Sequence, residues 1–546
     1  MEAHFHRITI TILAIFLPIL LSLPRFIPST TTSRAWSKLK SIFIYPAAFS
    51  KHHREPVAGA LIPTRGQIMY IFLLSLLNLI LLVAPYTITQ PQSSFTSRSR
   101  QLLSIIGNRA GQMAMGNVVA LFLFSSRNSI LLYLTDWSHN TYLLLHRWLG
   151  YWAVLHTVIH SAMLWSYYVK VGTYSSEFLR LYWIWGIVGT VAMCAIVPFS
   201  LPIIRKLFYE FFLVSHVALS LLFLVGYYYH IWYVYTYNWG YEIWMFVAAG
   251  IWAVERLVRV CRMVVRGSST AIVTVIPDTD EEYIKIEIEG KDLKGGVAYL
   301  CFPTLSWRFW ETHPFSVSGS IPHHQQDLTH SGSNSSSDLT PDTDTNPEKR
   351  ASVFVTPSST VITTEPHDPH PSTIFYARTR SGITKTLTNK AFGSDTKQMR
   401  LRVLIEGPYN HSGRIHSQLA QCSGILCIAG GVGITACLPL LKQNKSKEIK
   451  LFWSSRKAGL VAELRPTLNA FPENVEVETL VGQRFDVDSI IMRELVDCEE
   501  RSKGALAVVV SGPPGLADDV RQMVTRTVRS SKRSRPYLLV DEAFNW

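Results

Sequence analysis

Charged residues are scarce in this chain: they make up 17% of its 546 residues, against about 25% in ordinary soluble proteins. The seven cysteines include no CxxC pair, which argues against a zinc ribbon or a disulfide framework. Acidic residues are rare in the first half, where residues 1–257 hold 7 Asp and Glu against 18 Lys and Arg. Because this basic excess lies between apolar runs, we interpret it as membrane-topology charge and not as a nucleic-acid-binding face.

Runs of about 20 apolar residues predict membrane-spanning helices. They are 8–24, 66–85, 105–125, 143–166, 182–203, 208–232 and 241–257. The first run has the basic start and short apolar core of a signal peptide, but it lacks a small-residue cleavage site before Pro24, so we favour a retained helix. Lys and Arg gather on one side of the membrane if every run spans it. The positive-inside rule places that side, and the C-terminal half, in the cytosol.

The second half has the texture of a soluble protein. Short β-rich runs at 271–276 and 283–288, followed after residue 400 by alternating strands and helices, predict a β domain and then an α/β domain with a parallel sheet. Residues 321–371, rich in Ser, Thr, Pro and Asp, predict a disordered insertion. The expected parts are an N-terminal helix with a basic loop (1–65), a transmembrane domain (66–260), the β domain (267–410) and the α/β domain (411–546).

Two predicted membrane helices each carry a pair of histidines 14 residues apart, His146 with His160 and His216 with His230. Fourteen residues rise about 21 Å and return to within roughly 40° of the same helix face. The two helices run parallel, so His146 should lie level with His216 near the cytosol, and His160 with His230 near the outer face. Haem iron accepts an imidazole from each side. We therefore predict two bis-histidine haem sites.

Two other polar residues of the membrane runs need an explanation. His156 has no histidine at its level in the other helix, and we interpret it as a packing residue or a support for a ligand. Arg109 interrupts the third run and requires a counter-charge. A haem propionate and a lipid head group are equal candidates for that charge.

Motifs in the second half predict nucleotide binding. Gly430–Thr435 (GGVGIT) follows a buried strand and opens a helix, where glycines let a pyrophosphate approach the helix N-terminus. Ser454–Arg456 ends the next strand, and its hydroxyls and guanidinium suit the 2′-phosphate of NADPH. Ser511–Pro513 ends a further strand and points to the same crevice. His313–Ser318 is a candidate flavin site, and the terminal Trp546 is a candidate to stack on the flavin ring.

This combination resembles the fungal ferric/cupric reductases, relatives of the NADPH oxidases, over about residues 66–546 without the insertion. The likeness is carried by the paired histidines, by His313–Val317 as the FAD motif and by Arg380–Thr384 as a segment that helps to hold FAD phosphate. Two positions depart from the family pattern: Asn410 replaces a glycine of the GPYG turn, and Ser511 replaces a cysteine that lies near the nicotinamide in the family.

The motifs and the resemblance together imply a set of site residues. Haem iron ligands are His146, His216, His160 and His230, with Arg109 a candidate for a propionate; FAD contacts are His313, Pro314, Phe315, Ser316, Val317, Ser318, Gly382, Thr384 and Trp546; NADPH contacts are Gly407, Pro408, Gly430, Gly431, Gly433, Thr435, Ser454, Ser455, Arg456, Ser511, Gly512, Pro513 and Phe544.

The resemblance further implies a fold and an activity. The fold is a six-helix haem bundle plus one N-terminal helix, followed by a cytosolic ferredoxin-reductase-like module with a β-barrel FAD domain and an α/β NADPH domain. The activity is that of a plasma-membrane oxidoreductase, which passes electrons from NADPH through FAD and two haem b groups to ferric or cupric chelates outside. Two alternatives remain: an NADPH oxidase that reduces O₂ to superoxide, and a non-catalytic transport or scaffold protein with degenerate nucleotide sites.

Overall fold

The computed structural model describes residues 2–27, 33–57, 61–238, 240–305, 311–321, 371–409, 415–444, 447–496 and 504–542. The chain folds into two compact units. The smaller is Gly267–Pro408, and the larger joins Met1–Arg266 to Tyr409–Trp546. Nearly all of the predicted insertion at 321–371 lies outside the described residues.

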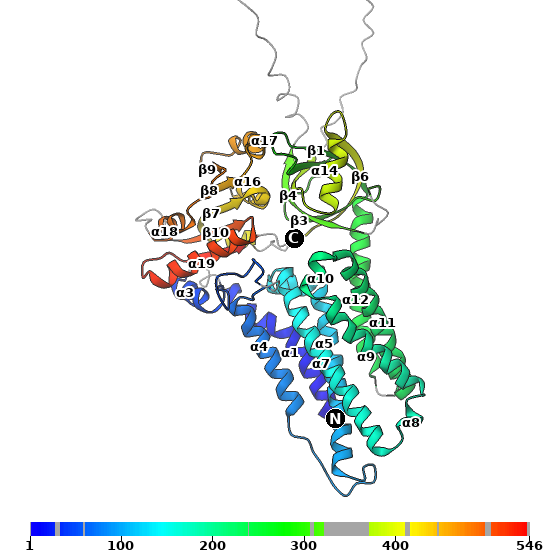
Figure 1. Ribbon diagram of the computed structural model, residues 1–546. Helices are drawn as coiled ribbons and strands as arrows, with labels where there is room; N and C mark the ends of the chain where they lie inside the picture. The colour runs from blue at the N-terminus through cyan, green and yellow to red at the C-terminus, as the bar shows by residue number, and fades with distance from the viewer. Residues whose placement is uncertain are drawn as a thin grey trace, which may run out of the picture. The chain divides into compact units, whose positions relative to one another are not determined.

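Long helices lie side by side in the first part of the larger unit (Figure 1). They are α1 (Glu2–Ser22), α4 (Arg65–Val83), α5 (Arg98–Ser125), α7 (His139–Val171), α9 (Leu181–Phe199), α11 (Tyr209–Tyr235) and α12 (Glu242–Arg266). Each covers one of the predicted apolar runs, which confirms those helices. Among the described residues, α1, α4, α9 and α11 are long and apolar enough to cross a membrane by length and composition. Helices α5 and α7 are more polar and carry the residues of greatest interest below.

Local sequence signals set the ends of these helices. Thr64 and Gln67 form a capping box at the start of α4: the Gln67 N–H donates to Thr64 Oγ1 at 3.3 Å, and the Thr64 N–H donates to Gln67 Oε1 at 2.9 Å. The Ser138 hydroxyl caps α7 by accepting from the Thr141 N–H at 3.2 Å. Helix α7 ends at Gly172, whose φ of 86° is one that glycine adopts at little cost.

Helix α1 packs into the bundle through polar contacts. The Thr11 hydroxyl donates to the Gly116 carbonyl at 3.0 Å, and the Tyr70 hydroxyl donates to the Ala14 carbonyl at 2.8 Å. The guanidinium carbon of Arg7 lies 4.6 Å from the ring centroid of Trp244. The retention of this helix stays a prediction from the sequence.

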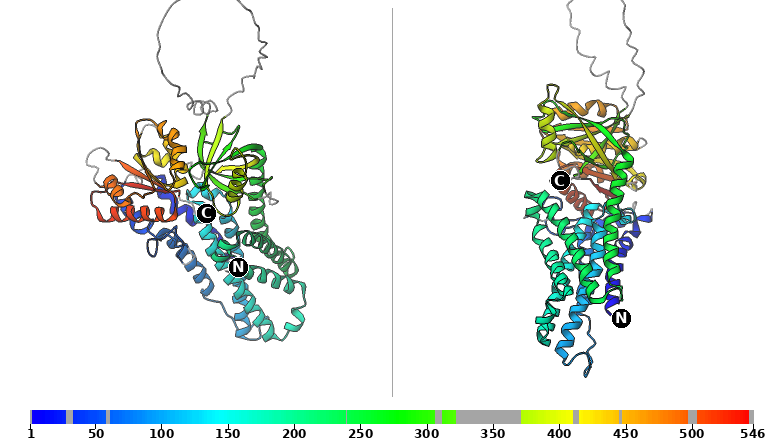
Figure 2. Two further views of the ribbon diagram at one scale, coloured as in Figure 1. Left: turned by 45° about the horizontal axis from the view of Figure 1, so that its top comes forward. Right: turned by 90° about the vertical axis from the view of Figure 1, so that its right-hand side faces the viewer.

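The smaller unit is a closed six-stranded barrel, also visible in Figure 2. Its strands are β1 (Ser268–Val275), β2 (Tyr283–Ile288), β3 (Val297–Cys301), β4 (His313–Ile321), β5 (Ser372–Arg378) and β6 (Gln398–Tyr409), in the order β1-β2-β5-β4-β3-β6. Inward-facing side chains such as Val273, Ile286 and Phe375 fill its core. Helix α14 (Ile383–Phe392) follows β5. The predicted β domain is confirmed as a barrel.

Five parallel strands form the sheet of the C-terminal part. They are β7 (Cys422–Gly430), β8 (Glu448–Ser455), β9 (Val475–Val481), β10 (Ala505–Ser511) and β11 (Tyr537–Asp541), in the order β11-β10-β7-β8-β9. The helices between them include α16 (Ile434–Gln443), α17 (Ala458–Asn469), α18 (Val487–Leu495) and α19 (Pro514–Ser530). Every residue of β10 is buried, as expected of a parallel strand covered on both faces. The predicted α/β domain with a parallel sheet is confirmed.

One contact had no counterpart in the sequence predictions. The short helix α3 (Arg34–Phe43) and the loop after it pack against α19 and β11, about 500 residues further along the chain.

Candidate functional site

The four predicted haem ligands form two pairs between α7 and α11. The ring centroids of His146 and His216 lie 6.3 Å apart, and those of His160 and His230 lie 6.1 Å apart. Because an imidazole nitrogen binds a metal at about 2.0–2.1 Å, two axial imidazoles place their ring centroids roughly 6 Å apart. Both separations therefore fit one metal between each pair of rings.

We call His160 and His230 the outer pair, and His146 and His216 the inner pair. In the outer pair, the Nδ1 atom of each ring lies within hydrogen-bond distance of a backbone carbonyl oxygen. His160 Nδ1 lies 2.8 Å from the Gly107 carbonyl, and His230 Nδ1 lies 2.8 Å from the Tyr182 carbonyl. Because a carbonyl only accepts, Nδ1 carries the proton in both rings and Nε2 keeps its lone pair. This is the tautomer that an iron ligand needs, and a hydrogen bond from the second nitrogen is typical of metal-binding histidines.

The inner pair repeats the pattern with one variation. His146 Nδ1 lies 2.9 Å from the Leu121 carbonyl. His216 Nδ1 lies 2.9 Å from the Ser200 hydroxyl oxygen, which can either donate or accept. The hydrogen-bonded Nδ1 atom in each ring leaves Nε2 for a metal, so the donor set of both pairs fits haem iron.

Glycines make room for the outer rings. A Cβ at Gly111 on α5 would lie 2.6 Å from His160 Nδ1, and a Cβ at Gly186 on α9 would lie 2.8 Å from His230 Nδ1. Only a residue without a side chain leaves both rings where they are. The sequence showed Gly111 only as a small residue in an apolar run, and nothing near Gly186 marked its role.

Arg109 belongs to α5, and its guanidinium lies at the C-terminal end of α4. Its Nη1 donates to the Ala84 carbonyl at 2.7 Å, and its guanidinium carbon lies 3.9 Å from the Tyr86 ring centroid. Helix C-terminal carbonyls carry partial negative charge, so they provide compensation for the guanidinium. The contact with a propionate or a lipid head group stays a prediction.

His156 is fully buried and lies apart from the paired rings. Its ring centroid lies 5.5 Å from that of Trp152. Neither ring nitrogen has a hydrogen-bond partner within the described part of the chain. The packing role remains the interpretation that fits these contacts.

The predicted nucleotide loops gather at one edge of the parallel sheet. Gly430, Ser455 and Ser511 each end a strand, and parallel strands bring their carboxyl ends to the same edge. The strand order reverses between β7 and β10, which is the position where such sheets bind nucleotides. Gly431, with φ of 55°, leads into the N-terminus of α16, and a helix N-terminus favours phosphate.

Close contacts between the backbones of two loops explain why glycine stands at two of the predicted NADPH positions. A Cβ at Gly433 would lie 2.4 Å from the Ser511 carbonyl oxygen, and one at Gly512 would lie 2.9 Å from the Gly430 nitrogen. The glycines therefore let the two loops touch. Pro513 comes after Gly512 and directly before Pro514, the first residue of α19.

The hydroxyl groups in these loops differ in their hydrogen bonds and in their exposure. Thr435 donates to the Val432 carbonyl at 2.8 Å, and Ser455 donates to the Lys457 carbonyl at 3.0 Å, so both brace their own loops. Ser454 is half-buried and Arg456 is exposed. The predicted sites at Asn410, Phe544 and Trp546 lie outside the described residues.

The predicted flavin motif lies on β4 of the barrel. Phe315 and Val317 point into the barrel core, so any contact they make with FAD comes from their backbone. The alternate residues Pro314, Ser316 and Ser318 lie on the other face of the strand, and His313 Nε2 lies 3.7 Å from Glu311 Oε2.

Two further predicted FAD and NADPH segments lie in the same unit. Gly382, with φ of 88°, precedes α14, and the Thr384 hydroxyl accepts from the Arg380 N–H at 2.9 Å. This gives a helix N-terminus suited to a phosphate. Gly407 and Pro408 lie near the end of β6, with φ of 119° at Gly407.

Comparisons with known proteins agree with the resemblance inferred from the motifs. Residues 110–227 match the family model "Ferric reductase like transmembrane component". The chain is 25% identical to "Ferric/cupric reductase transmembrane component 1" of Candida albicans, with 91% of this chain and 66% of that protein covered. It is also 25% identical to "Ferric reductase transmembrane component 6" of Saccharomyces cerevisiae, with 90% and 69% covered.

The chain thus spans about two thirds of the length of these curated relatives. Among solved structures, it is similar to a flavohemoglobin from Malassezia yamatoensis at 10% identity, with 82% of this chain and 99% of that chain covered and a TM-score of 0.32. The resemblance to fungal ferric/cupric reductase components is confirmed along nine tenths of the chain.

Proposed function

We propose that this chain, which carries a ferric reductase-like transmembrane component, is a transmembrane metalloreductase that uses NADPH to reduce ferric or cupric chelates and so supports metal uptake. The observation that carries the proposal is the geometry of the two histidine pairs. Each pair has ring centroids about 6 Å apart and two Nδ1 atoms engaged by oxygens, which leaves Nε2 available. With a histidine on each side, each pair would hold a haem iron, and an iron so held would serve electron transfer and not binding of a substrate at the metal.

The proposed cofactors are two haem b groups, FAD and NADPH. His146 with His216 would hold one iron, and His160 with His230 the other. When bound, FAD turns the two electrons of a hydride into single electrons, and haem carries one electron at a time.

The residues of the chain bind and orient these groups. The Gly107, Leu121 and Tyr182 carbonyls keep the imidazoles in the tautomer that presents Nε2. At the sheet edge, the Gly430–Gly433 loop offers backbone N–H groups and the N-terminus of α16 to a pyrophosphate. Ser454 lies at the end of β8, beside this loop, and Arg456 follows that strand. A hydroxyl and a guanidinium there would suit a 2′-phosphate, which supports the proposal of NADPH over NADH.

The proposed orientation follows from basic residues. Arg34, Lys38 and Lys40 precede α4, Arg205 and Lys206 lie between α9 and α11, and four arginines occupy the second half of α12. All lie at the same side of the bundle if each long helix spans the bilayer. The positive-inside rule assigns that side to the cytosol and the outer His160–His230 pair to the opposite face. We propose the plasma membrane as the location.

An optical titration of the purified full-length protein tests this function. We expect bis-imidazole haem bands that shift to the reduced form with NADPH and return to the oxidised form when a ferric chelate is added under argon. Protein without haem bands, or haem that NADPH does not reduce, would contradict the proposal. Reoxidation by O₂ with release of superoxide, and not by the chelate, would instead identify an NADPH oxidase.

A further inference from the structure

The segment between α1 and α4 packs on the C-terminal α/β part. One hydrogen bond and one aromatic contact join it to the start of β11. We call residues 33–57 the docking segment. Ser37 Oγ on α3 accepts from the Tyr537 N–H at 3.2 Å, and Ser37 is 1% exposed. The rings of Tyr45 and Tyr537 lie 5.8 Å apart. The docking segment therefore holds the first residue of β11.

A buried charged group holds the other end of β11. Arg54 Nε lies 3.0 Å from Asp541 Oδ2, and these side chains are 8% and 10% exposed. Arg521 on α19 pairs with the same carboxylate oxygen. Because two guanidinium groups share one carboxylate, removal of Arg54 leaves Asp541 paired with Arg521. The loss of the Arg54 side chain should therefore weaken the contact between the docking segment and the end of β11 without leaving a buried unpaired carboxylate.

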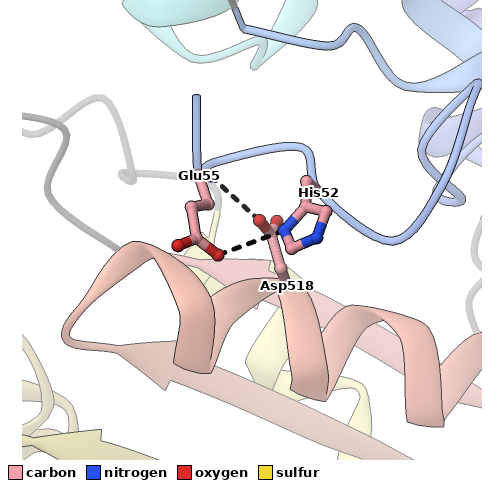
Figure 3. A group of neighbouring side chains, drawn as sticks. All are labelled: His52, Glu55 and Asp518. Atoms are coloured by element: carbon pink, nitrogen blue, oxygen red, sulfur yellow. Dashed lines mark hydrogen bonds and ion pairs between the residues drawn. The ribbon is translucent and has the colours of Figure 1, made fainter. Parts of the chain in front are cut away.

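Asp518 fixes the backbone of the docking segment beside this group. Its carboxylate oxygens accept from the Arg54 N–H at 2.8 and 3.0 Å and from the Glu55 N–H at 2.9 Å. Figure 3 shows His52 and Glu55 on the loop above Asp518 of α19, with His52 Nδ1 3.1 Å from Glu55 Oε2. The polar atoms of these three residues lie within 4.8 Å of one another. Since the backbone already occupies Asp518, we interpret the cluster as part of the docking contact and not as a metal site.

The ion pair between Arg54 and Asp541 lies next to the residues that contact the nucleotide loop. Asp541 is the last residue of β11, and the next residue, Glu542, donates its N–H to the Val510 carbonyl at 2.9 Å. The Ser511 hydroxyl donates to the Glu542 carbonyl at 3.2 Å. Ser511 in turn touches Gly433 of the pyrophosphate loop. A continuous set of contacts thus links Arg54 to the loop predicted to meet the nicotinamide.

We propose that Arg54 is a positioning residue for hydride delivery: through Asp541 and Glu542, it holds the Ser511–Pro513 loop in the orientation in which bound NADPH reacts. The inference rests on the proposed function, because it assigns the nicotinamide to this loop. Within the described part of the chain, the hydrogen bonds of Arg54 go to Asp518 and Asp541 and not to the nucleotide loop. The loss of Arg54 should therefore lower the rate of the reaction more than the affinity for NADPH.

The experiment compares full-length Arg54→Ala and Arg54→Lys with Arg400→Ala as the matched control. Arg400 lies on β6 of the barrel, is exposed, and its Nη2 lies 3.5 Å from Glu289 Oε1, so its loss removes an arginine that has no part in the docking contact. NADPH oxidation is measured with ferricyanide as a soluble acceptor, which reports hydride delivery without the membrane path. Docking is measured separately as the yield of a carbodiimide cross-link between Lys51 and Asp519, whose Nζ and Oδ1 lie 3.4 Å apart.

For Arg54→Ala we expect an about tenfold lower kcat, an NADPH KM within about twofold of wild type, and a cross-link yield that falls with kcat. Arg54→Lys should be intermediate in both, since it keeps the charge but not the planar guanidinium. Arg400→Ala should match wild type. Flavin and haem absorbance should be unchanged in all three.

Wild-type kcat and cross-link yield in Arg54→Ala would overturn the proposal, as would a loss of cross-link with unchanged kcat. If Arg54→Ala does not fold, Arg54→Lys decides: a joint fall in kcat and cross-link supports positioning, and wild-type values refute it. Failure of the wild type to reduce ferric chelates, with ferricyanide activity intact, would count against the proposed function and leave this inference standing.

Discussion

Gly111 lies directly beneath the imidazole of His160, and a Cβ at this position would come within 2.6 Å of His160 Nδ1. The same ring nitrogen lies 2.8 Å from the Gly107 carbonyl, one helical turn away on α5. One turn of α5 therefore supplies both the space for the ring and the hydrogen bond that sets its tautomer.

Replacement of Gly111 by alanine should displace the His160 ring. A contact of 2.6 Å forces the ring or the helix to move, at a cost of about 1–3 kcal/mol, and the hydrogen bond to Gly107 is lost with that movement. We expect loss of about half of the haem absorbance per protein, because only one of the two predicted sites depends on His160. The pyridine haemochrome assay measures this stoichiometry.

Gly250→Ala is the control for the glycine prediction. Gly250 also lies in a long helix, α12, but nothing lies within 4 Å of a Cβ there. Its haem content should match wild type, and Gly186→Ala should resemble Gly111→Ala because it crowds His230. Full haem content in Gly111→Ala would show that His160 holds no haem in the position described.

Arg109 should act on stability as well as on any bound group. Its guanidinium donates to the Ala84 carbonyl and lies over the Tyr86 ring, where it compensates the C-terminus of α4. Arg109→Gln should destabilise the bundle by about 1–3 kcal/mol, since the hydrogen bond between the buried guanidinium and the half-buried Ala84 carbonyl is lost. A lower thermal midpoint with unchanged haem stoichiometry and potential is expected from this capping role.

A propionate contact would give a different result for Arg109. Removal of a cation beside a propionate shifts the reduction potential of the haem, measured by spectroelectrochemistry. A shifted potential in Arg109→Gln would therefore support the contact predicted from the sequence, and an unchanged thermal midpoint would argue against capping.

The sequence predicted the histidine pairs because their information is local. A spacing of 14 residues maps to one helix face by geometry alone, and an apolar run limits the choice to a membrane helix. The Nδ1 partners could not be predicted in this way. Leu121, Gly107 and Tyr182 contribute carbonyl oxygens, which every residue has, so their side chains carry no signal of the role.

The docking segment shows the same limit at longer range. Arg54 and Asp541 are separated by 487 residues and belong to parts of the chain that were predicted independently. Arg54 was visible only as one of several basic residues that indicated topology. Its partner became visible when the fold placed the end of β11 beside it.

Docking should weaken in acid because of His53. Burial lowers the pKa of His53 from 6.5 to about 3, and the nearby Arg521 acts in the same direction. The undocked segment therefore binds a proton between these two pH values that the docked segment does not bind. Docking is fully favoured above about pH 6.5 and weakens as the pH falls from there towards 3.

Hydrogen exchange of residues 45–57, corrected for intrinsic rates, measures this pH dependence. Protection should be constant from pH 8 to about 6.5 and should decline below it. His53→Gln should flatten the decline, and His52→Gln, at the adjacent half-buried histidine, should leave it as in wild type. A decline that persists in His53→Gln would assign the acid sensitivity to another group.

Ser511 should be a structural hydroxyl in this chain, although it replaces a cysteine of the family pattern. It is fully buried, and its hydroxyl donates to the Glu542 carbonyl at 3.2 Å. Ser511→Ala removes this bond and should lower the free energy of unfolding by about 0.5–1.5 kcal/mol. Ser511→Cys should not restore it, because a thiol is a weak donor and the larger sulfur must fit beside a backbone contact that excludes even a Cβ at Gly433.

Thermal unfolding followed by flavin fluorescence measures both variants, with half-buried Ser454→Ala, at the end of β8, as the control that should lose less. A Ser511→Cys protein more stable than wild type would mean that the loop accommodates the thiol, and that serine at this position is not required by the contact with Glu542.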